Sequence, residues 1–261
     1  MKFLKKILNF YLNSSIHVAL AVYAFIRITE MYFKLPYNEN LDYFIFYGTI
    51  TGYNFVKYAG VAKLHHKSLT NDLKIIQVFS LLCFLAMCYY GCLIDSKTLL
   101  LSVPFALITV LYAVPFLSGF AKNLREISYL KIIVVAFVWN GFTVLIPLFD
   151  AGNEGSLSVV FYAIQRFLLV IVLILPFDIR DMKFDAIYLQ TIPKKIGIER
   201  TKKLGVALLV FSLVLEFMSS TEITVKSPFM LFFFLMIIFL MRAKINQSKY
   251  YSSFWVESLP I

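Results

Sequence analysis

Three aspartates lie close together in the stretch PFDIRDMKFD, directly after the strongly apolar run FLLVIVLIL. Asp178, Asp181 and Asp185 occupy positions i, i+3 and i+7, which fall on one face of an α-helix. Carboxylates that converge near an apolar medium repel one another unless a cation lies among them. Mg²⁺ in such sites takes about one or two carboxylates and bridges to substrate phosphates. The spacing therefore predicts a metal-assisted phosphate site at the end of an apolar helix.

A second interpretation of the same stretch needs no metal ion. Arg180 and Lys183 alternate with the aspartates, so local ion pairs at the membrane surface would also satisfy the carboxylates. The DxxDxxxD spacing is only moderately specific, and by itself it leaves both interpretations open.

The composition places these aspartates in a membrane protein. Of 261 residues, 60% are hydrophobic and 15% are charged, and the mean hydropathy is +0.79. A soluble domain contains about 45–50% apolar and about 25% charged residues. We therefore expect an integral membrane protein, in an inner or plasma membrane. Because the apolar runs are continuous rather than alternating, they predict helices and exclude an outer-membrane barrel.

Eight apolar segments are interpreted as membrane-spanning helices. Their expected limits are 15–33, 41–59, 75–94, 98–118, 129–149, 157–178, 203–221 and 228–243. No internal repeat or low-complexity linker divides the sequence. The expected fold is thus an all-α, polytopic transmembrane helical bundle that forms a single domain over residues 1–261.

The positive charges predict the orientation, because Lys and Arg accumulate in cytoplasmic loops. A cytoplasmic N-terminus places 20 of the 25 basic residues on the cytoplasmic side, including those of the long loops 57–74, 119–131 and 179–202. Both termini are then cytoplasmic, and any chemistry belongs to that face. The net charge of +10 has the same origin, so nucleic acid is not an expected partner.

The stretch FDIRDMKFDAIYLQTIPKKIG resembles the second aspartate-rich motif of the UbiA superfamily of intramembrane prenyltransferases. That motif has an R-D-x-x-x-D core followed by a threonine, an apolar residue and a glycine. The matching residues are Arg180, Asp181, Asp185, Thr191, Ile192 and Gly197. The KNLREISYLK stretch, which contains Lys122 and Arg125, is similar to the basic loop of the family before its fifth helix.

The resemblance implies a fold and a function. Members of the family have about nine helices, and they transfer a prenyl group from an isoprenyl diphosphate to a lipophilic acceptor. Two aspartate-rich motifs hold Mg²⁺ ions that neutralise the diphosphate. Eight helices can be identified here, and whether residues 244–261 supply a ninth is left open by the sequence.

The first family motif, N-D-x-x-D-x-x-x-D, is degenerate in this chain. It falls on NFVKYAGVA, where Asn54 matches but Phe55, Tyr58 and Ala62 replace the aspartates. We infer that Lys57 and Lys63 supply positive charge to the diphosphate in place of a metal ion. A lysine that extends its charged end from the membrane edge toward water explains Lys57 equally well.

The expected site combines these residues. Asp181, Asp185 and Lys57 are the candidate catalytic residues, and Asp178, Asp181 and Asp185 are the candidate Mg²⁺ ligands. The candidate diphosphate-binding residues are Asn54, Lys57, Lys63, Lys122, Arg125 and Arg180. The alternative function is a non-catalytic membrane protein of the same fold that binds an isoprenoid lipid after loss of the first motif.

Overall fold

The computed structural model describes residues 2–62, 71–114, 130–153, 155–183, 191–219 and 223–261. These residues form helices and connecting turns, without a strand in any of the described ranges. The elements are α1 (Lys2–Asn13), α2 (Ile16–Phe33), α3 (Glu39–Ala62), α4 (Asn71–Gly91), α5 (Ser96–Ala113), α6 (Leu130–Asn140), the π-helical turn η2 (Gly141–Leu145), α7 (Ile146–Asp150), α8 (Leu157–Asp181), α9 (Ile192–Ile196), α10 (Ile198–Ser219), α11 (Ile223–Arg242) and the π-helical turn η3 (Tyr251–Val256).

The helical bundle confirms the predicted all-α class. Each of the eight expected spans overlaps a long helix, with α6, η2 and α7 together forming the fifth. Within the described residues, five helical segments are long and apolar enough to cross a membrane: α2, α4, α5, 130–150 and α8. The other three expected spans, α3, α10 and α11, pack beside them in the same bundle. The orientation of the bundle in the membrane stays a prediction.

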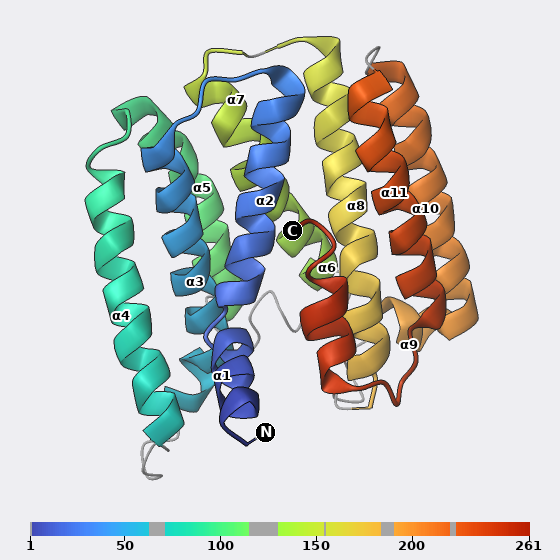
Figure 1. The fold of residues 1–261 in the computed structure, drawn as a ribbon, viewed down its shortest axis with the longest axis horizontal. Coiled ribbons are helices and arrows are strands. Elements are labelled where there is room, and N and C mark those ends of the chain that lie inside the picture. The colour runs from blue at the N-terminus through green and yellow to red at the C-terminus, as the bar shows by residue number, and fades with distance from the viewer. Residues whose placement is uncertain (1, 63–70, 115–129, 154, 184–190, 220–222) are drawn as a thin grey trace, which may run out of the picture.

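The helices form two groups. Helix α3 packs against α2, α4 and α5, and helix α8 packs against α6, α10 and α11. Figure 1 shows the first group in blue and green on one side and the second in yellow, orange and red on the other. The largest apolar core joins them through residues such as Phe25, Trp139 and Leu173.

Close helix packing in the second group depends on a glycine. A Cβ atom on Gly205 of α10 would lie 2.5 Å from Leu240 of α11 and 2.9 Å from Leu175 of α8. Small residues allow helices in membranes to approach closely and to gain van der Waals contact. Gly205 therefore fixes α8, whose end carries the aspartates, against two neighbouring helices.

A π-helical turn interrupts the fifth span. It lies just before Pro147, which has no N–H to donate to the carbonyl of Thr143 and disrupts regular α-helical bonding there. The Thr143 carbonyl instead accepts a hydrogen bond from the Thr29 hydroxyl of α2, at 2.6 Å. The irregular turn is thus satisfied by a neighbouring helix, as helices in lipid require.

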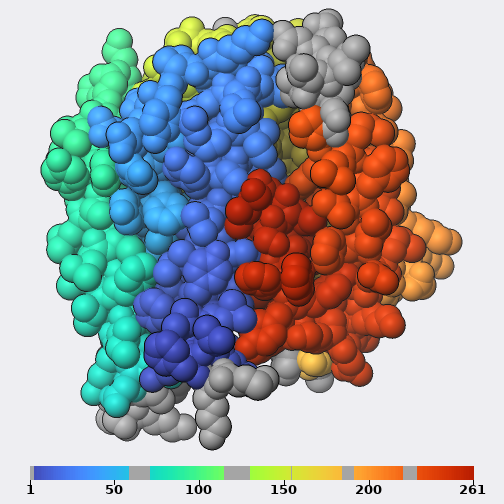
Figure 2. Space-filling model, in the orientation of Figure 1, coloured from blue at the N-terminus to red at the C-terminus, as the bar shows by residue number. Residues whose placement is uncertain are grey.

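The C-terminal segment, residues 244–261, is not a ninth spanning helix. After α11 the chain turns back along the bundle as the short turn η3, and its end lies between α2 and α8 (Figure 1). The carbonyl of Phe254 is 2.9 Å from Nε2 of His17, whose ring stacks on the Phe254 ring. Figure 2 shows the dark red C-terminal residues directly against the blue N-terminal helices. The segment therefore connects the two helix groups.

Candidate functional site

A cavity of about 840 Å³ lies between the two helix groups. Helices α2, α3, α5, α6 and α8 and the C-terminal segment all contribute to its wall. Small-molecule sites in proteins have volumes of about 300–1,000 Å³ and mostly apolar walls. The apolar part of this wall includes Val18, Val22, Ile45, Val135, Trp139, Phe142, Val170, Leu173 and Ile174. A cavity with such an apolar wall can accommodate a long hydrocarbon chain.

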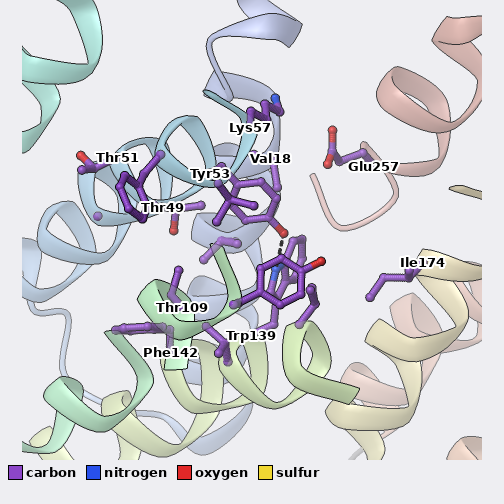
Figure 3. Close-up of a pocket in the computed structure, with 18 of the residues that line it drawn as sticks. Val18, Thr49, Thr51, Tyr53, Lys57, Thr109, Trp139, Phe142, Ile174 and Glu257 are labelled. Carbon is purple, nitrogen blue, oxygen red and sulfur yellow. Dashed lines mark hydrogen bonds between the residues drawn. The ribbon is translucent and has the colours of Figure 1, made fainter. Parts of the chain in front are cut away.

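Two aromatic side chains meet in the apolar part of the cavity. The indole Nε1 of Trp139 donates a hydrogen bond of 2.7 Å to the hydroxyl of Tyr53, and Figure 3 shows this contact as a dashed line. The bond satisfies the indole N–H, so the two rings contribute apolar surface and π-faces to the cavity. Aromatic faces attract cations.

One end of the cavity is charged. Its lining contains four basic residues, Lys57, Lys131, Arg180 and Lys249, and three acidic residues, Asp178, Asp181 and Glu257. These residues come from α3, α6, α8 and the C-terminal segment. The structure therefore places Lys57, Asp178, Arg180 and Asp181 around one cavity, although more than 120 positions separate Lys57 from the other three in the sequence.

Asp178 forms an ion pair that the sequence did not predict. Its side chain is completely buried, and its Oδ1 accepts a hydrogen bond of 2.7 Å from Nζ of Lys131, at the start of α6. A buried carboxylate needs such a partner because desolvation of an unpaired charge is very costly. Lys131 compensates the charge of Asp178 in the structure, and the role of Asp178 as a metal ligand stays a prediction.

Asp181 is the last residue of α8, and it is paired with its neighbour. The Nε of Arg180 donates to Oδ1 of Asp181 at 2.7 Å, and a second guanidinium nitrogen donates to Oδ2 at 3.2 Å. Arg180 also donates to the hydroxyl of Ser253 in the C-terminal segment, at 2.9 Å. The local ion pair expected from the alternative interpretation is therefore present, and it lies in the wall of the cavity.

Of the predicted stripe of three aspartates, the structure describes Asp178 and Asp181, both on α8, which ends at Asp181. Asp185, Lys63, Lys122 and Arg125 lie outside the described residues, and their site assignments stay predictions. Among the described residues, no group of three or more His, Cys, Asp or Glu side chains is arranged to hold a metal ion.

Lys57 lines the charged end of the cavity from α3. Its Nζ donates hydrogen bonds to the hydroxyl of Ser15, at 2.8 Å, and to the carbonyl of Leu12, at 3.3 Å. An ammonium group has three N–H donors, so two protein contacts leave one donor for a ligand. The turn between α1 and α2 thus positions Lys57 at the cavity.

Asn54 forms hydrogen bonds within the protein, and its predicted role in binding diphosphate stays a prediction. It is 3% exposed and lies outside the cavity lining. Its Oδ1 accepts from the Ser15 hydroxyl at 2.8 Å, and its Nδ2 donates to the Ser14 carbonyl and the Ser80 hydroxyl. These bonds fix α3 to the α1–α2 turn and to α4, so the amide is used within the protein.

Glu257 is a cavity residue that the sequence analysis missed. It lies on the C-terminal segment, and Figure 3 shows it on the same side of the pocket as Lys57. Burial raises the pKa of its carboxyl group to about 7, against the opposing effects of the positive charges of Lys57 and Arg180. No motif includes Glu257, and only the backward turn of the chain after α11 brings it to the site.

The carboxylates at this end differ in their fitness for Mg²⁺, which prefers oxygen ligands. Asp181 lines the cavity and its side chain is 29% exposed, so it presents oxygen atoms to a ligand. Asp178 lines the same cavity, but its side chain is buried and its Oδ1 accepts a hydrogen bond from Lys131. Among the described residues, Asp181 therefore fits a metal ion. The described part of α3 offers no counterpart of the first aspartate-rich motif.

Comparisons with known proteins identify the fold. Neither a family model nor a curated protein matches the chain. Solved structures do match over nearly the whole chain. A UbiA homologue from Archaeoglobus fulgidus, described as bound to GPP and Mg²⁺, is 16% identical with a TM-score of 0.60, over 96% of this chain and 95% of that one.

Two further structures agree with this result. A UbiA homologue from Aeropyrum pernix K1, described as an apo structure, is 15% identical with a TM-score of 0.59 over 94% of each chain. A structure described as digeranylgeranylglyceryl phosphate synthase is 16% identical with a TM-score of 0.54, over 99% of this chain and 96% of that one. The chain therefore has the UbiA fold, as the sequence resemblance implied.

Proposed function

We propose that this protein is an intramembrane prenyltransferase, which transfers an isoprenyl group from a polyprenyl diphosphate to a lipophilic acceptor. The observation that carries the proposal is the combination, in one cavity, of a long apolar body with a charged end that includes Lys57, Arg180 and Asp181. Structures of the same fold are described as bound to GPP and Mg²⁺ and to DMAPP and Mg²⁺, which supports a prenyl diphosphate as the ligand.

The basic residues at the charged end bind the diphosphate in this proposal. Lys57 has one N–H donor beyond its two contacts with the protein. Arg180 lies opposite on α8, where its guanidinium is suited to hold phosphate oxygens in a fixed geometry. Lys63, Lys122 and Arg125 are proposed to add positive charge from the adjoining segments.

Asp181, with Asp185 in the following segment, would hold a single Mg²⁺. When bound, the ion would stabilise negative charge on the leaving diphosphate. Binding it requires that Arg180 release one or both carboxylate oxygens of Asp181, and the freed guanidinium then becomes available to the phosphates. The protein would thus exchange one ion pair for contacts with the substrate.

The cavity also favours the ionisation of the substrate. Its apolar wall excludes water from the prenyl chain, which protects a reactive allylic cation and strengthens the electrostatic interactions of the charged end. Lys57 is positioned before the reaction by its contacts with Ser15 and Leu12, so it stabilises the charge that develops on the diphosphate with little reorganisation. Arg180 contributes once its contacts with Asp181 have been exchanged. The Tyr53 and Trp139 rings offer their faces to the developing positive charge.

The proposal is tested by incubation of the purified protein with radiolabelled geranylgeranyl diphosphate, with and without Mg²⁺. A prenyltransferase is expected to bind the diphosphate and to release inorganic pyrophosphate in a Mg²⁺-dependent manner. Failure of the wild-type protein to bind geranylgeranyl diphosphate would contradict the proposal.

A non-catalytic protein that binds an isoprenoid lipid is the second candidate function. The observation in its favour is that both described aspartates of the motif are already compensated by basic side chains, Asp178 by Lys131 and Asp181 by Arg180. Such a protein would bind geranylgeranyl diphosphate or a neutral isoprenoid without releasing pyrophosphate. The same incubation therefore separates the two functions.

A further inference from the structure

Three carboxylates line the charged end of the cavity, and their surroundings differ. Asp178 is paired with Lys131, and Asp181 is paired with Arg180. Among the described residues, by contrast, the Glu257 side chain has neither a hydrogen-bond partner nor an ion-pair partner within 4 Å. Glu257 is therefore the cavity carboxylate whose oxygen atoms are available to a ligand.

The backbone around Glu257 is held firmly in place. The N–H of Glu257 donates to the Ser252 carbonyl at 3.1 Å, and the N–H of Ser258 donates to the Phe254 carbonyl at 2.9 Å. Within the same turn, Phe254 stacks on His17 of α2 and Ser253 accepts a hydrogen bond from Arg180 of α8. The C-terminal turn is thus anchored on both sides, and it presents Glu257 to the cavity.

The charged and titratable groups that act on Glu257 come from three helices. Lys57 of α3 and Arg180 of α8 are close enough to act on its charge. Its own charge acts on the phenol groups of Tyr11 in α1 and Tyr53 in α3. Glu257 therefore lies beside the two cations to which the proposed function assigns the diphosphate, and above the apolar part of the cavity.

We propose that Glu257 binds the hydroxyl group of the acceptor and takes up its proton as the prenyl group is transferred. The acceptor would then be a lipid-soluble alcohol or phenol, with an apolar body that enters the cavity and a hydroxyl group that reaches its charged end. This inference rests on the proposed prenyl transfer, and it adds to it the chemical class of the acceptor and the residue that recognises it.

The proposed step balances in atoms and charge. The bond between C1 of the prenyl group and the diphosphate oxygen breaks, and its electron pair leaves with the diphosphate. A lone pair of the acceptor oxygen forms the new C1–O bond. The proton of the acceptor hydroxyl passes to the Glu257 carboxylate, so the products are a prenyl ether and inorganic pyrophosphate.

The acidity of Glu257 suits this role. A general base works best when its pKa lies near the operating pH, and burial brings the pKa of Glu257 to about 7. Below that pH the carboxyl group is protonated and accepts no further proton. Prenyl transfer is therefore expected to increase as the pH rises through about 7.

The test compares two probes of almost equal shape, 1-naphthol and 1-methoxynaphthalene, of which only the first has an O–H group. Their affinities are measured for the full chain in lipid nanodiscs with geranylgeranyl diphosphate bound, after subtraction of binding to empty nanodiscs. A hydrogen bond to a charged group is worth about 1.5–3 kcal/mol, so the wild type should prefer 1-naphthol by roughly 10- to 100-fold.

Substitutions at position 257 test whether this carboxylate is the source of the preference. Glu257→Leu should abolish the preference for 1-naphthol. The isosteric Glu257→Gln keeps the shape of the side chain but carries no charge, and it should reduce the preference. Glu199→Leu is the matched control because that carboxylate lies outside the cavity lining and its side chain is 76% exposed. If Glu257→Leu does not fold, the comparison is made with Glu257→Gln.

The outcomes distinguish this inference from the proposed function. Binding of geranylgeranyl diphosphate is measured first, and its absence would refute the proposed function. With that binding intact, absence of 1-naphthol binding, or an equal preference in the wild type and the Glu257 variants, would overturn the assignment of Glu257. Formation of geranylgeranyl naphthyl ether in the wild type, with a loss of about 10²–10⁴-fold in Glu257→Gln, would support it.

Discussion

Replacement of Lys57 by methionine tests the charged end of the cavity. Methionine keeps the length and the apolar packing of the lysine stem but removes the ammonium group. In the structure that group donates to the Ser15 hydroxyl and the Leu12 carbonyl, and the residue lines the cavity. The substitution therefore removes one proposed contact with the substrate and two contacts within the protein.

The two kinds of contact have different expected costs. Loss of a donor to charge that develops in the transition state typically lowers the rate by about 10²–10³-fold, equivalent to about 2.7–4 kcal/mol. Loss of two hydrogen bonds within the protein costs about 1–3 kcal/mol of stability, at about 0.5–1.5 kcal/mol for each bond. The contacts with Ser15 and Leu12 therefore predict a loss of stability beside the loss of turnover.

The assay is release of pyrophosphate from saturating radiolabelled geranylgeranyl diphosphate, with thermal unfolding measured on the same preparation. Lys57→Arg is the matched control, since it retains a positive charge at the same position and should keep more activity than Lys57→Met. Turnover in folded Lys57→Met equal to that of the wild type would refute the role of the lysine. A fall in stability with unchanged turnover would limit Lys57 to its structural contacts.

Three further substitutions test the surroundings of the site. Lys131→Met removes the cation that pairs with the buried Asp178 and should lower the free energy of unfolding by about 3–5 kcal/mol, and a second change, Asp178→Leu, should restore most of it. Asn54→Ala should cost about 1–3 kcal/mol in thermal unfolding while the Kd for geranylgeranyl diphosphate stays unchanged. Glu257→Gln should stabilise the protein at pH 8 and have little effect at pH 5. Folding raises the pKa of this carboxyl group from 4.5 to about 7, so its ionisation opposes folding increasingly as the pH rises through that range, and the full cost is present above about 7. An equal effect at both pH values would contradict the burial of its charge.

The sequence predicted the helices well because their main determinant is local. Continuous apolar runs must form helices in lipid, and the limits of α2 and α8 agree with the expected spans within a few residues. The end of the chain was harder to predict. Residues 244–261 are too short and too polar for a span, and the turn of this segment toward His17 depends on contacts over more than 200 positions.

The site was predicted in its location but not in its pairings. Asp178 and Asp181 both line one cavity at the end of α8, whereas their role in binding a metal ion stays a prediction. The sequence did not show that Lys131, on another helix, neutralises Asp178. Nor did it show that the amide of Asn54, which matched a family motif, is used by three serines. A motif match identifies a residue type, whereas the packing of the surrounding helices decides its partners.

The charge balance of the described cavity explains how a diphosphate site can exist without the first aspartate-rich motif. An aspartate at position 55, where Phe55 lines the cavity, would make this end more acidic, and a bound anion would need more metal ions to compensate the added charge. With Phe55 there, the described lining has four basic and three acidic side chains. Its positive residues can then attract a diphosphate directly. The loss of the first motif and the presence of Lys57 are therefore complementary, and a protein of this kind is expected to depend on fewer metal ions than one with both motifs.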